Sequence, residues 1–309
     1  MKKKLLLAAP IITTSSIYLL SRLLYSYAFK RSDIVPEPGK DIIGYAEDYY
    51  YYLDWLESQP NREHWQLKSK TNHHKLNAIW LPAKNPSKFT VIISHGYKGN
   101  NITMANQAHM FHHMGFNVLM PDSRGHGDSC DNYISFGWLD HYDLLAWINM
   151  VLHRIGPKSQ IYVLGVSMGG ANVLMLAGEK LPTQVKGIIA DCGYSSLNEE
   201  FEYLAHKQTK LPVKPILKIM SSINKIKNGF SFDVVNSVKQ LKKSTLPIFI
   251  IHGAKDEYVP TYMAYKNYNA IPGKKKIWIV PNAGHTMAFC IDPREYHKQV
   301  ADFIKSTMN

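Results

Sequence analysis

The stretch Gln160-Ile-Tyr-Val-Leu-Gly-Val-Ser-Met-Gly-Gly170 decides the fold. Its apolar run, Ile161 to Leu164, predicts a buried strand, and the residues from Gly170 onward predict a helix. Between them, Gly165-Val-Ser-Met-Gly169 fits the G-x-S-x-G turn, in which a side chain at either outer position would collide with the neighbouring strand and helix. G-x-S-x-G alone is a common pattern, but the flanking strand and helix favour a turn that exposes the Ser167 hydroxyl as a nucleophile.

A serine nucleophile needs a histidine base, and the base needs an acid that orients it. The apolar run 247–251 is followed by His252-Gly-Ala-Lys-Asp256, and the run 276–280 is followed by Asn282-Ala-Gly-His285. We therefore predict His285 as the base and Asp256 as the acid. Glu257 and Asp191 remain alternatives for the acid.

A developing oxyanion needs two hydrogen-bond donors beside the serine. The backbone N–H of Met168 lies at the start of the predicted helix, where partial positive charge gathers. Ser94-His-Gly-Tyr97 ends an earlier apolar run, so the Tyr97 N–H is the candidate second donor.

Short continuous apolar runs recur along the chain and suit a parallel sheet covered on both faces. The expected strands are residues 90–94, 117–120, 161–164, 185–190, 247–251 and 276–280, preceded by two strands at 63–68 and 75–81. Helices are expected at 104–114 and 138–155 and after Ser167. A gap of more than fifty residues separates the strands at 185–190 and 247–251.

These ordered motifs, together with Arg124-Gly-His-Gly127, resemble the α/β-hydrolase superfamily over about residues 60 to 306, in particular its monoglyceride-lipase-like and serine-aminopeptidase-like branch. The resemblance implies an α/β fold with a mostly parallel central sheet, helices on both faces and a helical cap inserted before the acid-bearing strand. It also implies the catalytic roles given above, with the His-Gly and Arg-Gly-His-Gly loops as structural supports. One departure is Val166, where this branch often has histidine.

The resemblance implies a serine hydrolase that cleaves carboxylic esters, as a carboxylesterase or lipase, through an acyl-enzyme on Ser167. Its expected substrate is a small-molecule or lipid acyl ester. A serine peptidase or amidase of the same fold is the alternative. A non-catalytic binding module is less favoured, because such proteins usually lose a triad residue or an elbow glycine. The three cysteines lack metal-ligand spacing, and no metal or cofactor is expected.

The formal net charge of +12 belongs to two segments. Residues 1–40 carry seven Lys/Arg against two acids, and residues 206–243 carry nine Lys against Asp233 alone. This distribution argues against a nucleic-acid partner and favours an anionic membrane surface.

The predicted cap, residues 194–244, contains an amphipathic helix. Its apolar positions are Ile216, Met220, Ile223 and Ile226, and Lys214, Lys218 and Lys225 fall largely on the other side. Either the apolar face packs over the pocket, or the cap also docks on anionic lipid.

The N-terminus begins Met1-Lys-Lys-Lys4 and continues with a moderately apolar segment, Leu5 to Tyr27, whose only charge is Arg22. We expect residues 1–32 to form an uncleaved, single-pass signal anchor followed by the hydrolase domain, residues 33–309. A cleaved signal peptide is the alternative. The positive-inside rule leans toward a cell-membrane protein with an extracytoplasmic catalytic domain.

Overall fold

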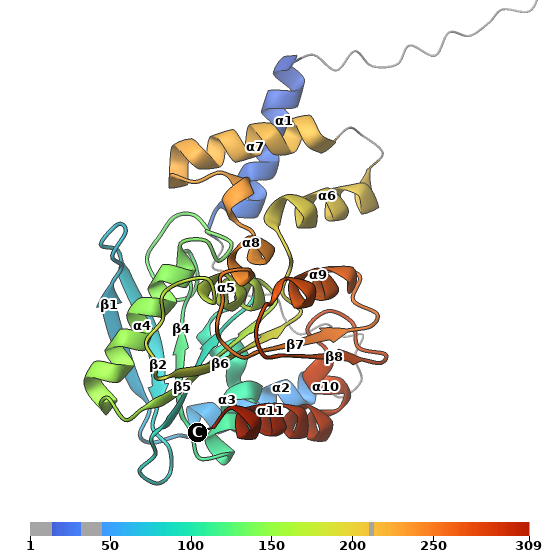
Figure 1. Cartoon of the computed structure of the whole chain (residues 1–309). Helices are drawn as coiled ribbons and strands as arrows, with labels where there is room; N and C mark the ends of the chain where they lie inside the picture. The colour runs from blue at the N-terminus through green and yellow to red at the C-terminus, as the bar shows by residue number, and fades with distance from the viewer. Residues whose placement is uncertain (1–13, 32–44, 210–212, 309) are drawn as a thin grey trace, which may run out of the picture.

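The computed structural model describes residues 14–31, 45–209 and 213–308. Its centre is an eight-stranded sheet with the order β1-β2-β4-β3-β5-β6-β7-β8 (Figure 1). β1 pairs antiparallel with β2, and β2 with β4, whereas the remaining neighbours are parallel. The strands are β1 (Glu63–Lys68), β2 (Lys75–Leu81), β3 (Phe89–Ser94), β4 (Asn117–Pro121), β5 (Gln160–Val166), β6 (Val185–Asp191), β7 (Ile248–Gly253) and β8 (Lys275–Val280). The predicted mostly parallel sheet is confirmed.

Helices cover both faces of the sheet (Figure 1). Successive residues of a strand point to opposite sides, and because both sets are apolar here, each face must be covered. In β3, Val91 and Ile93 pack with one helical layer and Ile92 packs with the other. The first layer contains α2 (Tyr45–Glu57), α3 (Ala105–His113), the short α10 (Ala288–Ile291) and α11 (Pro293–Thr307). The second contains α4 (Asp140–Ile155), α5 (Met168–Leu176) and α9 (Tyr262–Ala270).

The cap consists of helices inserted between β6 and β7, as predicted. They are α6 (Leu197–Gln208), α7 (Val213–Asn228) and α8 (Ser237–Leu241). The buried positions of α7 are Val213, Leu217, Met220 and Asn224. Ile226 is 86% exposed, so its predicted place on the packed face is wrong. It lies two residues after Asn224, which turns its side chain about 200° away around the helix.

The N-terminal helix, α1 (Thr14–Phe29), lies against α7 of the cap (Figure 1). Among the described residues, no helix is long and apolar enough to cross a membrane. The predicted transmembrane helix is therefore not supported there, and residues 1–13 of the expected anchor lie outside the described residues.

Candidate active site

The turn after β5 has the strained geometry expected of a nucleophile elbow. Ser167 has φ 57° and ψ −118°, a conformation that L-residues rarely adopt. A Cβ added at Gly169 would lie 2.1 Å from the Ser94 carbonyl oxygen, and one at Gly165 would lie 2.0 Å from the Gly169 carbonyl oxygen. The steric requirement for both glycines is thus confirmed, and it lets α5 start directly against the end of β3.

The loops after β5, β7 and β8 bring Ser167, Asp256 and His285 together, because the carboxyl ends of parallel strands meet at one edge of the sheet. Ser167 Oγ lies 2.7 Å from His285 Nε2, and His285 Nδ1 lies 2.7 Å from Asp256 Oδ2. The Asp256 side chain is fully buried, whereas that of His285 is 20% exposed. The arrangement leaves the serine and imidazole reachable from outside and the acid shielded.

Asp256 is held by its own loop as well as by His285. Its Oδ1 accepts hydrogen bonds of 2.9 Å from the backbone N–H groups of Tyr258 and Val259. Burial alone would raise the pKa of Asp256, but hydrogen bonds from His252 and His285 outweigh burial and hold that pKa well below its usual range. The group is therefore an ionised carboxylate at neutral pH.

The alternative acids do not contact the base. Asp191 accepts a hydrogen bond of 3.1 Å from the Tyr296 hydroxyl, and burial raises its pKa to about 7. The Glu257 side chain is 85% exposed and pairs with Lys207 at 3.1 Å. Among the three carboxylates considered from the sequence, Asp256 alone is placed to orient His285.

The two predicted oxyanion donors lie beside the elbow. Met168 is the first residue of α5, so its N–H has no partner within the helix. On the other side, a Cβ added at Gly96 would lie 3.3 Å from Ser167 Cβ, so the loop that carries Tyr97 lies directly against the serine. The Tyr97 N–H, next along this loop, therefore remains the candidate second donor.

The His-Gly and Arg-Gly-His-Gly loops support one another. His126 Nε2 accepts from the Lys98 N–H at 3.1 Å, next to Tyr97, and His95 Nε2 accepts from the Ser123 N–H at 2.9 Å. Burial lowers the pKa of both histidines, that of His126 to about 3, which keeps these nitrogens neutral acceptors. The two loops are thereby fixed around the proposed oxyanion site.

One group of possible metal ligands overlaps the site. Cys192, Asp256 and His285 each place a ligand atom within 4.8 Å of the others. Burial raises the pKa of the Cys192 thiol well above its usual value, which disfavours the thiolate that a metal requires. Asp256 and His285 are hydrogen-bonded to each other, between Oδ2 and Nδ1.

A cavity of about 500 Å³ lies between α1 and the cap helices α6 and α7. Tyr97 and Tyr258 belong to its lining, and the Tyr258 ring lies 5.0 Å from the His285 ring, centroid to centroid. The rest of the lining is mostly apolar: Leu20, Leu24, Tyr27, Ala28, Phe136, Phe201, Leu204, Ala205, Gln208, Thr209, Val213, Ile216, Leu217 and Met220. The volume falls in the range of about 300–1,000 Å³ typical of small-molecule sites.

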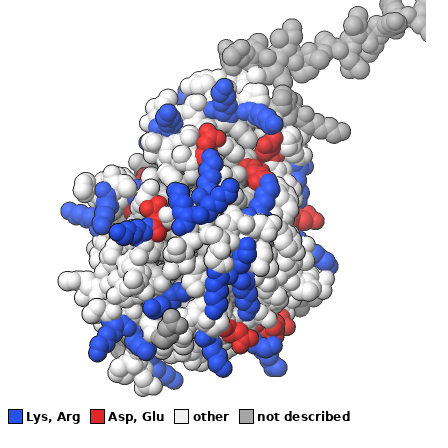
Figure 2. All heavy atoms as spheres, in the orientation of Figure 1, with Lys and Arg blue, Asp and Glu red and all other residues white. Residues whose placement is uncertain are grey.

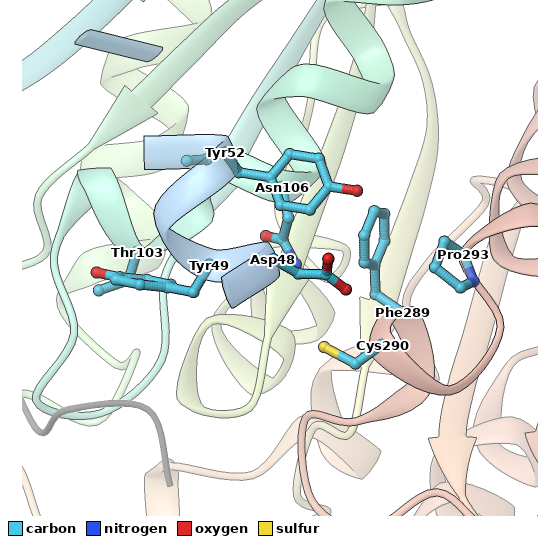
Figure 3. A pocket seen from close by; sticks show the side chains of 9 residues that line it. Asp48, Tyr49, Tyr52, Thr103, Asn106, Phe289, Cys290 and Pro293 are labelled. Carbon is cyan, nitrogen blue, oxygen red and sulfur yellow. The ribbon is translucent and has the colours of Figure 1, made fainter. Parts of the chain in front are cut away.

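A smaller pocket lies between α2 and α10, lined by Tyr49, Tyr52, Phe289 and Cys290 among others (Figure 3). The Tyr52 and Phe289 rings meet edge to face there, with their centroids 5.9 Å apart. Its volume of about 20 Å³ holds one or two water molecules at most. It is therefore too small to serve as a substrate site.

Two features of this site were not predicted from the sequence. His252, quoted only as part of the motif before Asp256, lies with its Nε2 3.3 Å from Asp256 Oδ2. Its position directly after an apolar strand and four residues before the acid was the available signal. The contribution of α1 to the cavity had no local signal, because it depends on contacts with segments far away in the chain.

Comparison with known proteins agrees with this architecture. A family model described as "alpha/beta hydrolase fold" matches residues 90–214, and one described as "PhoPQ-activated pathogenicity-related protein" matches residues 217–309. The esterase Pf2001 of Pyrococcus furiosus superposes with a TM-score of 0.66 at 22% identity, covering 90% of this chain and all of that one. The protein thus has the α/β-hydrolase fold, which confirms the predicted fold class.

Curated relatives match over most of their length. YqkD of Bacillus subtilis, an uncharacterized protein, is 28% identical over 215 residues, 70% of each chain. The uncharacterized YfhR of Escherichia coli K12 is 29% identical over 222 residues, 71% of each chain. The monoglyceride lipase of Rattus norvegicus is 25% identical over 258 residues, 71% of this chain and 84% of that one. The fold and these relatives support a hydrolase.

Proposed function

We propose that this protein is a serine hydrolase that cleaves carboxylic esters through an acyl-enzyme on Ser167. The observation that carries the proposal is the continuous chain of 2.7 Å contacts from Ser167 through His285 to Asp256. The similarity to a monoglyceride lipase, and to acetyl esterase Axe7A of Xylanibacter ruminicola at 30% identity over 125 residues, favours an ester as the substrate.

The protonation states follow from the contacts. An ionised Asp256 can only accept, so His285 Nδ1 carries the proton between them, and neutral His285 Nε2 accepts the Ser167 hydroxyl proton. As Ser167 Oγ attacks the ester carbonyl, that proton passes to His285 and then to the leaving alcohol. Water deacylates the enzyme by the same route, releasing the carboxylic acid and restoring the serine.

The oxyanion of each tetrahedral intermediate would accept hydrogen bonds from the Tyr97 and Met168 backbone N–H groups. Both donors belong to rigid backbone, one at a helix start and one in a loop fixed by His126, so little reorganisation accompanies the reaction. Each step of this reaction uses only groups of the protein, the ester and water.

The test is hydrolysis of p-nitrophenyl butyrate by the full-length protein, with labelling of the serine by a fluorophosphonate. Ser167→Ala should lower turnover at least about 10⁴-fold and abolish labelling while leaving the melting temperature close to that of the wild type. Aminoacyl p-nitroanilides assayed alongside separate an esterase from an amidase. Labelling or turnover that survives in Ser167→Ala would mean that another residue is the nucleophile.

We also propose that the protein meets lipid esters at an anionic membrane surface. Leu19 and Leu23 of α1 are 59% and 62% exposed, and Ile226 of α7 is 86% exposed. Helix α7, which carries Ile226, also carries exposed lysines, Lys214 and Lys218 among them, and Figure 2 shows Lys and Arg side chains over the cap (Figure 2). Apolar side chains beside cations are the combination that binds anionic bilayers.

A further inference from the structure

Helix α1 is seated on the cap by one of its faces. Ser21, Tyr25 and Phe29, spaced four residues apart, are almost fully buried. The Tyr25 hydroxyl donates a hydrogen bond of 3.1 Å to Asn224 Oδ1 of α7, and the Phe29 ring stacks on the Phe232 ring with centroids 5.2 Å apart. This face fixes which of the other α1 residues point toward the large cavity.

A second face of α1 lines the cavity. Leu20, Leu24, Tyr27 and Ala28 recur at positions i, i+4, i+7 and i+8, which is one stripe of a helix, and all four belong to the lining. Leu20 and Leu24 are 38% and 40% exposed because the cavity opens to solvent along this side. The cavity therefore has α1 as one wall and as part of its mouth.

The carboxyl end of α1 is joined to the loop of the proposed oxyanion donor. The Tyr97 hydroxyl donates a hydrogen bond of 2.9 Å to the Ala28 carbonyl oxygen, and Lys98 Nζ lies 4.7 Å from the centre of the Tyr27 ring. In addition, the Ile134 N–H donates to the Phe29 carbonyl oxygen at 2.7 Å. These contacts hold the α1 wall in register with the active-site edge of the sheet.

Two residues of the cavity lining lie next to the active-site residues. Tyr97 follows Gly96, whose backbone lies against Ser167, and the Tyr258 ring lies 5.0 Å from the His285 ring in a tilted arrangement. A group the size of a water molecule or a methylene occupies about 30 Å³, so about 500 Å³ accommodates roughly ten carbons or more. An unbranched apolar chain that starts at Ser167 would fill it.

We propose that α1 forms one wall of the acyl-chain site, with Leu20 and Leu24 determining how long an acyl chain the protein accepts. This proposal rests on the proposed ester hydrolysis and names the part of the substrate that the cavity holds. The ligand is the medium or long acyl chain of an ester, extending from Ser167 between α1, α6 and α7.

The experiment compares Leu24→Trp with Leu23→Trp in the full-length protein. The first variant places an indole in the cavity, and the second places it one residue away on a side chain that is 62% exposed and outside the lining. We expect Leu24→Trp to lower kcat/KM for p-nitrophenyl decanoate about tenfold or more. A tenfold loss requires that the indole displace only about two methylenes of the acyl chain from the cavity. Activity on p-nitrophenyl acetate should change less than about twofold, because its acyl group does not reach α1. Leu23→Trp should change neither, because the assay contains no bilayer for the exposed Leu23 position to contact.

Two further measurements distinguish a failure of the α1 proposal from an absence of esterase activity and from misfolding of a variant. Melting temperatures establish that both variants fold. Binding of a fluorescent long-chain fatty acid to Ser167→Ala, with and without Leu24→Trp, reports the cavity without turnover and should weaken about tenfold. If the wild type hydrolyses no ester, the proposed function fails. The binding measurement then still shows whether α1 forms a wall of the acyl-chain site. An unchanged decanoate-to-acetate ratio in Leu24→Trp, or unchanged fatty-acid binding, overturns the role of α1.

Discussion

His252 Nε2 lies 3.3 Å from Asp256 Oδ2, the same oxygen that accepts the hydrogen bond from His285 Nδ1. His252 Nε2 also lies 2.8 Å from the Val259 carbonyl oxygen, which can only accept, so this nitrogen carries a proton. Two imidazoles therefore face one buried carboxylate from different sides. We interpret His252 as a positioning residue that keeps Asp256 ionised and aimed at His285.

Removing this second donor should affect turnover more than substrate binding. We expect His252→Leu to lower kcat about tenfold with little change in KM, and to raise the pKa of Asp256, so that activity on the acid side is lost at a higher pH than in wild type. His252→Gln, which retains a donor, should restore most of the loss. Equal kinetics and pH profiles for the two variants would show that hydrogen-bond donation by His252 has no role.

Asp256→Asn tests the orienting acid itself. The amide cannot stabilise the imidazolium and favours the wrong His285 tautomer, so kcat should fall about 10³- to 10⁴-fold with the fold intact. Glu257→Gln is the matched control, because that neighbouring side chain is 85% exposed and pairs only with Lys207 among the described residues. Rates of ester hydrolysis and of fluorophosphonate labelling measure both variants. A loss in Glu257→Gln as large as that in Asp256→Asn would contradict the assignment.

The sheet and the three candidate catalytic residues could be predicted from the sequence because their signals are local. The predicted strands at residues 63–68 and 75–81 coincide with β1 and β2, and those that follow differ from the structure by two residues or fewer at each end. The loops after β7 and β8 carry Asp256 and His285 directly behind apolar runs. Strand ends in a parallel sheet converge, so these local features also fix which residues meet.

The place of α1 could not be predicted in this way. An apolar run has the same composition whether it faces lipid or packs against a protein surface, and the deciding contacts are distant in sequence. Tyr25 and Asn224, for example, are 199 residues apart. The position of Ile226 was predicted wrongly for a related reason, since several helical stripes of α7 are apolar and only tertiary packing shows which one is buried.

A buried carboxyl group in the cap should make stability depend on pH. Glu200 of α6 is 3% exposed, neither of its carboxyl oxygens has a hydrogen-bond partner among the described residues, and burial raises its pKa to about 9. The unfolded chain releases this proton near pH 4.3. Between these values the folded protein binds the extra proton, so stability should fall as pH rises, by at most about 1.4 kcal/mol per pH unit.

Thermal or urea unfolding between pH 5 and 9 measures this slope. The unfolding free energy of Glu200→Gln should depend less on pH than that of the wild type across this window, because the titrating group is gone. Glu199→Gln provides the control: hydrogen bonding to Lys266 and Ser195 outweighs burial and lowers the pKa of Glu199, so its removal should not flatten the slope. Parallel slopes in wild type and Glu200→Gln would show that Glu200 titrates normally in the folded protein.

The cap lysines should control binding to anionic vesicles. Lys214, Lys218 and Lys225 are exposed on α7, the helix that also carries the exposed Ile226. Each lysine near a charged bilayer contributes about 1 kcal/mol, so Lys→Gln at all three should weaken vesicle binding about 100-fold at low salt. Lys→Gln at three exposed lysines outside the cap, Lys84, Lys158 and Lys305, removes the same charge and should weaken binding much less, because screening confines the attraction to about 10 Å. Co-sedimentation with phosphatidylserine-containing and pure phosphatidylcholine vesicles gives both affinities. Equal binding to the two lipids, or equal losses in the two triple variants, would refute docking through the cap.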